Sequence, residues 1–140
     1  MGLSENNCVF CKIIGGEIPC YKIYEDKDFL AFLDISQFTK GHTIVIPKRH
    51  VDWVWDYEDN GKYFGIVSKI ANHFKSLGYK YVDSMIFGRG VPHAHIHLIP
   101  HNGENGDYRK ATESLDMLTD RKRRPSSNKF KKIAEEFRLF

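Results

Sequence analysis

The segment Val91–Ile99 constrains the fold more than any other part of the sequence, because histidines alternate along it with small and apolar residues. Successive side chains of a β-strand point to opposite faces of the sheet, so the alternation predicts a strand with two different faces. The row expected to be buried is Ala94, Ile96 and Leu98, and the row expected on the opposite face is His93, His95 and His97. Holding three imidazole rings side by side costs free energy, and a chain rarely does so without a function for them. The histidine row therefore predicts a functional site.

The remaining hydrophobic pattern predicts a mixed fold with a single long helix between Asp59 and Gly78. Its expected buried face is Tyr63, Phe64, Val67, Ile70, Ala71, Phe74 and Leu77. Shorter helices are expected at Asn7–Ile14 and from Ser127 to about Arg138. Four further strands are expected at Tyr21–Tyr24, Phe29–Leu33, Thr43–Pro47 and Tyr79–Phe87. Strands with one long intervening helix predict an α+β fold with a five-stranded antiparallel sheet.

Length and composition bound the class of protein. We expect a single domain over residues 1–140, with a core at about 7–101 and a C-terminal extension at 102–140. The aromatic content of 14% predicts a folded chain, and the net charge of +3 is too small to indicate a nucleic-acid partner. The basic run Arg121–Arg124 is interpreted as a solvated surface. No apolar run is long enough for a membrane span, and MGLSENNC lacks the features of a secretion signal, which together predict a cytoplasmic protein.

Chemistry alone leaves two functions open for the histidine row. Neutral imidazole is the commonest protein ligand for zinc and similar ions, so the row can form a metal site. A neutral imidazole nitrogen can also attack a phosphoryl centre and form a phosphoramidate that water later cleaves. The pair Cys8-x-x-Cys11 is a second candidate metal or redox site, because an odd number of cysteines does not suggest a disulfide framework.

The histidine row is followed by Leu98-Ile99-Pro100, and three other segments precede it along the chain. These segments are Cys8–Pro19, Phe32–Ser36 and Gly41–His50. Together the four segments resemble, in sequence and in order, the histidine triad (HIT) family of nucleotide hydrolases and transferases. The resemblance implies the HIT fold, a symmetric homodimer and an activity on nucleotides.

By this resemblance, His95 is the catalytic nucleophile. It would attack the α-phosphorus of a purine nucleotide, such as a nucleoside phosphoramidate, and form a covalent nucleotidyl-histidine that water hydrolyses. His97 would contact the phosphate or the leaving group, and His42 would orient the catalytic ring. Asp34 corresponds to the acidic residue that accepts the ribose hydroxyls, a role that suits a carboxylate.

The resemblance also implies a nucleotide pocket and a structural zinc ion, with no organic cofactor. The remaining nucleotide-binding residues would be Val9, Phe10, Ile13, Phe32, Ile35, Arg89 and Gly90. The zinc ligands would be Cys8, Cys11, His50 and His93, a donor set that suits a tetrahedral structural site. Reduced cysteines without a metal are the alternative.

The loop before the histidine row departs from the family pattern. The segment Met85–Val91 is several residues shorter than in most members, and Arg89 stands where glutamine is common. A charged donor at Arg89 would favour a polyphosphate leaving group. Three alternatives therefore stay open: a dinucleoside polyphosphate hydrolase, a nucleotide-binding adaptor with weak turnover, and a metalloprotein that binds no nucleotide.

Overall fold

The computed structural model describes residues 7–103 and 125–139 of the chain. By its internal contacts the chain divides into two compact units, Met1–Tyr108 and Arg109–Phe140, which are described separately. The basic run Arg121–Arg124, interpreted above as a solvated surface, lies outside the described residues. Within the described part of the chain, no helix is long and apolar enough to cross a bilayer.

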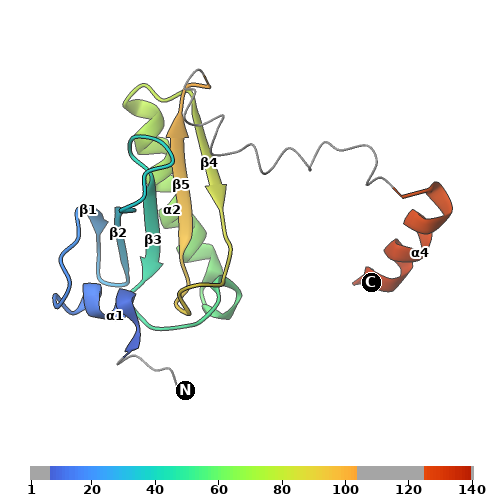
Figure 1. Ribbon diagram of the computed structural model, residues 1–140, viewed down its shortest axis with the longest axis horizontal. Helices are drawn as coiled ribbons and strands as arrows, with labels where there is room; N and C mark the ends of the chain where they lie inside the picture. The colour runs from blue at the N-terminus through green and yellow to red at the C-terminus, as the bar shows by residue number, and fades with distance from the viewer. Residues whose placement is uncertain (1–6, 104–124, 140) are drawn as a thin grey trace. The chain divides into compact units, whose positions relative to one another are not determined.

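The first unit is built on a five-stranded antiparallel sheet, as predicted, in the order β1-β2-β3-β5-β4 (Figure 1). The strands are β1 (Lys22–Glu25), β2 (Phe29–Leu33), β3 (Thr43–Pro47), β4 (Tyr81–Met85) and β5 (Ile96–His101). The last strand in the sequence, β5, lies between β3 and β4. The end of the histidine row therefore lies in the interior of the sheet.

The strand predicted over Val91–Ile99 begins only at Ile96, so His93 and His95 precede it. Before Ile96 the backbone forms hydrogen bonds outside the sheet. The His93 N–H donates to the Val91 carbonyl at 2.8 Å, and the Ala94 N–H donates to the Val51 carbonyl at 2.7 Å. The first bond closes a tight turn, and the second attaches the segment to the loop after β3. Because the period of two does not hold through the turn, His93 need not share a face with the other histidines.

One face of the sheet is covered by α2 (Asn60–Ser76) (Figure 1). The Asp59 side chain caps its N-terminus by accepting the Lys62 N–H at 3.0 Å, and Gly78 follows its end with a positive φ of 107°. The helix buries Tyr63, Val67, Ile70 and Phe74 against the sheet side chains Phe29, Ala31, Val45, Ile96 and Leu98. The long helix is confirmed, but Phe64 and Leu77 are 42% and 62% exposed instead of buried.

Alternate side chains of the same strands pack on the opposite face of the sheet, against the short helix α1 (Val9–Ile14). This second core contains Cys8, Phe10, Leu30, Phe32, Ile44 and Ile46. Because strand side chains alternate, β2 and β3 supply both cores from neighbouring residues. The α1 face is the one that carries the candidate site.

Two smaller helices complete the described structure. A 3-10 helix, η2 (Val54–Asp56), lies between β3 and α2 and buries Val54. In the second unit, α4 (Ser127–Phe137) is capped by the Ser126 hydroxyl, which accepts the Lys129 N–H at 3.3 Å. Its presence confirms the predicted closing helix.

Candidate active site

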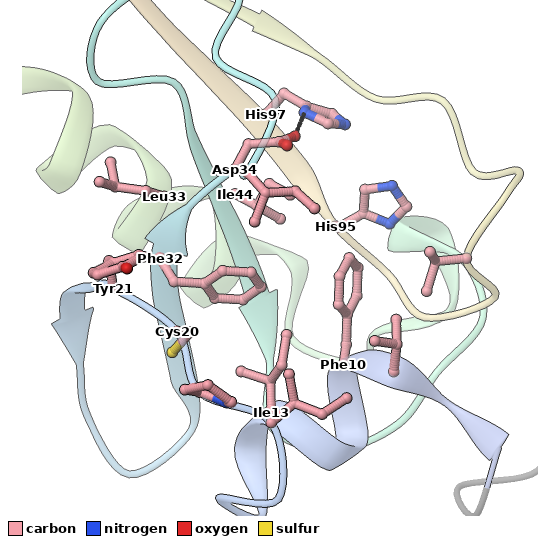
Figure 2. A pocket seen from close by; sticks show the side chains of 15 residues that line it. Phe10, Ile13, Cys20, Tyr21, Phe32, Leu33, Asp34, Ile44, His95 and His97 are labelled. Atoms are coloured by element: carbon pink, nitrogen blue, oxygen red, sulfur yellow. Dashed lines mark ion pairs between the residues drawn. The ribbon is translucent and has the colours of Figure 1, made fainter.

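An apolar cavity of about 400 Å³ opens between α1, the end of β2 and the histidine row. Figure 2 shows Asp34, His95 and His97 on one side of it, and the apolar side chains of Phe10 and Ile13 on the other. The full lining is Val9, Phe10, Ile13, Ile18, Pro19, Cys20, Tyr21, Phe32, Leu33, Asp34, Ile35, Ile44, Val91, His95 and His97. A mostly apolar cavity with a few convergent polar groups is typical of a small-molecule site.

Six of the eight predicted nucleotide-binding residues line this cavity: Val9, Phe10, Ile13, Phe32, Asp34 and Ile35. Arg89 and Gly90 are exposed and are not among the lining residues. The prediction missed the stretch Ile18–Tyr21 between α1 and β1, which forms part of the wall. Its only signal in the sequence was that Ile18 and Pro19 end the segment that resembles the HIT family.

His95 has one ring nitrogen held by the backbone. Its Nδ1 lies 2.7 Å from the His93 carbonyl oxygen, which can only accept a hydrogen bond, so Nδ1 carries a proton. In the neutral ring this leaves Nε2 without a proton. The Phe10 ring packs against the imidazole in a T-shaped arrangement at a centroid distance of 5.3 Å, and only 7% of His95 is exposed. The ring thus has the tautomer and the fixed position that a nucleophile needs.

Asp34, His42 and His97 form a second group, here called the cavity cluster. His42 Nε2 lies 2.9 Å from His97 Nδ1, and the Asp34 Oδ2 lies 3.6 Å and 3.8 Å from these two nitrogens. Burial lowers the pKa of both rings, that of His97 to about 4, and the neighbouring Asp34 carboxylate opposes the shift. Both imidazoles are therefore neutral at physiological pH.

The loop between β2 and β3 holds the cavity cluster in shape through Gln37. Its side-chain amide donates to the carbonyls of Asp34 at 2.5 Å and His42 at 2.8 Å, and its carbonyl accepts the Gly41 N–H at 2.8 Å. Three bonds from one side chain therefore join the two ends of the loop. The prediction missed this residue because a polar loop residue carries no periodic signal.

Cys8, Cys11, His50 and His93 form the cysteine–histidine cluster, whose four donor atoms lie within 4.8 Å of one another. His93 Nδ1 lies 3.3 Å and 3.5 Å from the Cys8 and Cys11 sulfurs, and His50 Nδ1 lies 3.2 Å from the Cys11 sulfur. A tetrahedral zinc ion with ordinary bond lengths separates sulfur and nitrogen ligands by about 3.5 Å. The four residues predicted as ligands therefore fit such an ion.

The outer nitrogens of the two cluster histidines fit a metal site as well. His93 Nε2 donates to the Pro47 carbonyl at 2.8 Å, and His50 Nε2 lies 3.1 Å from an Asp52 carboxylate oxygen. A histidine that donates its outer N–H in this way presents an unprotonated nitrogen to the metal. Burial also lowers the pKa of His93 to about 4, which favours the neutral ring.

Phe10 links the two sides of the site. Its ring packs edge-on against His93 at 5.8 Å, against His95 at 5.3 Å and against Phe32 at 5.7 Å. Phe10 lies in the first turn of α1, between the N-cap residue Cys8 and Cys11, so the segment that carries both thiols also supplies part of the cavity wall. The cysteine–histidine cluster and the cavity therefore depend on the same short helix.

The HIT domain family model matches residues 15–104, which is more than half of the chain and includes the three histidines of the row. The chain belongs to the HIT family. It is 46% identical over 110 residues to Protein hit of Bacillus subtilis, covering 73% of this chain and 76% of that protein. It is 36% identical over 102 residues to adenosine 5'-monophosphoramidase hnt1 of Schizosaccharomyces pombe, covering 70% and 77%.

A solved structure supports the same fold. The crystal structure of a HIT family protein from Bacillus anthracis aligns with a TM-score of 0.67 and 40% sequence identity. The alignment covers 82% of this chain and 92% of the other. The five-stranded α+β architecture is therefore that of the family.

Proposed function

We propose that the protein is a nucleotide hydrolase that cleaves a bond at the α-phosphorus of a purine nucleotide through a covalent intermediate on His95. The observation that carries the proposal is the position of His95 at the polar end of an apolar cavity, with its Nδ1 proton held by the His93 carbonyl. The activity named for the fission-yeast relative, an adenosine monophosphoramidase, supports the same reaction class.

The cavity suits a nucleoside monophosphate group. Its aromatic and aliphatic walls, which include Phe10 and Phe32, can hold a purine ring by stacking and dispersion with little discrimination between bases. At the polar end the Asp34 carboxylate can accept hydrogen bonds from the ribose hydroxyls. The α-phosphate would then lie near His95 and His97.

The reaction proceeds in two displacements. The unprotonated Nε2 of His95 attacks the α-phosphorus, a phosphorus–nitrogen bond forms, and the bond from phosphorus to the leaving group breaks. The leaving group would take a proton from the His97–His42 pair, and the attacking water of the second displacement would return one. Water then attacks the same phosphorus, which releases the nucleoside monophosphate and regenerates His95. His97 and His42 would orient the phosphate and exchange protons through their 2.9 Å hydrogen bond.

The cysteine–histidine cluster would hold a structural zinc ion through Cys8, Cys11, His50 and His93. Four protein ligands leave no open position, so such an ion would stabilise the fold and take no part in the chemistry. Support comes from the donor separations and from the outer hydrogen bonds of both histidines. Zinc content measured on the purified protein tests this assignment.

The protein would act as a symmetric homodimer. The sheet ends in the edge strand β4, and an edge strand presents unpaired backbone groups that favour pairing with another strand. Its first residue, Tyr81, is 43% exposed. Light scattering in solution measures the mass directly, and a monomer at micromolar concentration would contradict the homodimer.

The deciding experiment compares hydrolysis of adenosine phosphoramidate by the wild type and by His95→Ala. We expect the variant to lose at least about 10³-fold in kcat, because the covalent route is removed. Mass spectrometry of quenched wild-type reactions should detect a nucleotidyl adduct on His95. The matched control is His73→Gln, which removes an exposed histidine of α2 and should keep full activity.

Two results would redirect the proposal. If the wild type binds AMP but hydrolyses no nucleotide, the protein is a nucleotide-binding adaptor. If neither AMP nor any substrate binds, a metalloprotein without a nucleotide is the better description. Both measurements need only calorimetry and a product assay.

A polyphosphate substrate is the second candidate, and Arg89 is the residue that favours it. Arg89 is exposed and precedes by two residues Val91, which lines the cavity, so only a leaving group that extends out of the cavity would reach it. Arg89→Ala should then lower diadenosine polyphosphate hydrolysis more than phosphoramidate hydrolysis. Equal effects on both substrates would leave Arg89 without a role in choosing the leaving group.

A further inference from the structure

The cavity cluster brings together three side chains that are all ligands for transition metals. His42 Nε2, His97 Nδ1 and the Asp34 Oδ2 lie 2.9, 3.6 and 3.8 Å apart. Two nitrogen ligands of one zinc ion are separated by about 2.9 Å at a right angle and by about 3.4 Å at the tetrahedral angle. The observed separations need shifts of only a few tenths of an ångström to surround a single ion.

We propose that Asp34, His42 and His97 form a second metal site, which takes a divalent transition ion such as Zn²⁺ and competes with the nucleotide for the cavity. Two imidazoles and one carboxylate favour zinc and its neighbours over magnesium or calcium, which prefer oxygen ligands. The competition rests on the proposed function, whereas the binding of the ion rests on the cluster alone.

The surroundings of the cluster meet the further requirements of a metal site. His42 Nδ1 lies 3.0 Å from the Ser36 carbonyl oxygen, so a proton on Nδ1 leaves Nε2 free to coordinate. The Phe38 N–H lies 3.2 Å from the same Nδ1, which means that the other tautomer also has a partner in the absence of an ion. The side chains are well enclosed, with 5%, 13% and 16% of His42, His97 and Asp34 exposed.

An ion has a route to this site, and the site has room for a fourth ligand. Asp34 and His97 both line the cavity, so an ion can enter where the nucleotide would enter. Three protein ligands leave an open coordination position, in contrast to the four donors of the cysteine–histidine cluster. Occupation by an ion would engage the Asp34 carboxylate and His97, the two groups proposed to hold ribose and phosphate.

Calorimetric titration of the intact protein tests the binding. The wild type is first loaded with one equivalent of Zn²⁺ and dialysed, which fills the cysteine–histidine cluster, and is then titrated with ZnCl₂. We expect one further ion to bind with a micromolar Kd. Asp34→Asn and His42→Gln should each lower the affinity for this second ion by more than about tenfold. Even the loss of a hydrogen-bond partner of a ligand lowers metal affinity by about that factor.

The controls separate the two sites and the effects of misfolding. His73→Gln should leave both ions bound, because this histidine is exposed on α2, away from both clusters. Thermal melts establish that Asp34→Asn and His42→Gln are folded, and having two variants keeps the test decisive if one fails to fold. The metal site is overturned if the wild type binds no second ion, or if the second ion binds equally well to both folded variants.

The competition is measured by repeating the second titration with saturating AMP. We expect the apparent Kd of the second ion to rise at least about tenfold. Reciprocally, the second ion should raise the apparent Kd of AMP by the same factor. If AMP binds and the second ion is unaffected, the competition is overturned. If AMP does not bind at all, the proposed function fails, and the metal site stands or falls on the variant titrations.

Discussion

The cysteine–histidine cluster and the cavity cluster bring together similar side chains in different surroundings. Both contain two histidines, and in each cluster all the potential metal-ligand atoms lie within 4.8 Å of one another. The first has four donors, two of them sulfurs, and its histidines are fixed by Pro47 and Asp52. The second has three donors, two of which face a cavity. The comparison teaches that donor number and access to the cavity, more than residue type, distinguish the proposed structural site from the proposed reactive one.

The largest expected effect is on stability, at the cysteine–histidine cluster. Removal of the metal with a chelator, or substitution by Cys8→Ser and Cys11→Ser, should destabilise the fold by several kcal/mol, because structural zinc contributes directly to folding free energy. Chemical denaturation with and without chelator measures the loss. Cys20→Ser is the control, since this third cysteine belongs to neither cluster. Equal stability of the metal-free and metal-loaded protein would contradict the structural role.

Acidification of the metal-free protein should give the next largest effect. Burial lowers the pKa of His93 and His97 from 6.5 to about 4 in the folded protein, so the unfolded chain takes up protons first. Stability is therefore complete above about pH 6.5 and falls as the pH drops toward about 4, by on the order of 2 kcal/mol for each ring at pH 5. Denaturation at several pH values measures this slope, and His97→Gln should reduce it. A flat profile would show that the rings are not buried as neutral groups.

At the cavity cluster the expected effect is on ligand binding and not on folding. Asp34→Asn should lower the affinity for AMP by about 10- to 100-fold, because hydrogen bonds to a charged group contribute about 1.5–3 kcal/mol. The matched ligand control is 2',3'-dideoxy-AMP, which lacks the hydroxyls and should bind the wild type and the variant equally. An unequal loss with the dideoxy ligand would mean that Asp34 does not act through the ribose.

The smallest expected effect is that of Gln37→Ala, which removes three hydrogen bonds that join the loop between β2 and β3. We expect AMP to bind about fivefold more weakly, since one or two net hydrogen bonds are worth about 1 kcal/mol. Lys40→Ala, at an exposed position of the same loop, should change nothing. If AMP binds equally well to both variants, the loop does not depend on Gln37 for its shape.

The sequence predicted the fold well where a period extended over a whole element. The apolar period along α2 identified its length and most of its buried face, and Asp59 and Gly78 marked its ends. Phe64 and Leu77 were placed wrongly on that face because the apolar stripe is wider than the contact with the sheet. The predicted ends of β3 match the structure, because a β-branched run favours a strand and a proline ends it.

The candidate site was harder to predict, because its geometry depends on contacts between distant segments. A strand through the whole histidine row predicted three rings on one face, but the turn at Val91–His93 turns the first ring toward the cysteines. The role of Gln37 depends on where two carbonyls of the loop lie, which no local pattern records. The resemblance to the HIT family indicated Cys8 and Cys11, which lie next to His93 in the structure, where spacing could not.

The shortness of α1 has a consequence for engineering. A helix of six residues is not stable in isolation, so its position depends on Cys8, Cys11 and Phe10. Val9 and Ile13 face the cavity from the same helix and belong to neither metal cluster. Substitutions at these two positions would therefore change the shape of the cavity and leave the residues of both clusters in place. If the cavity binds a nucleotide as proposed, variants at Val9 and Ile13 would change which base it selects.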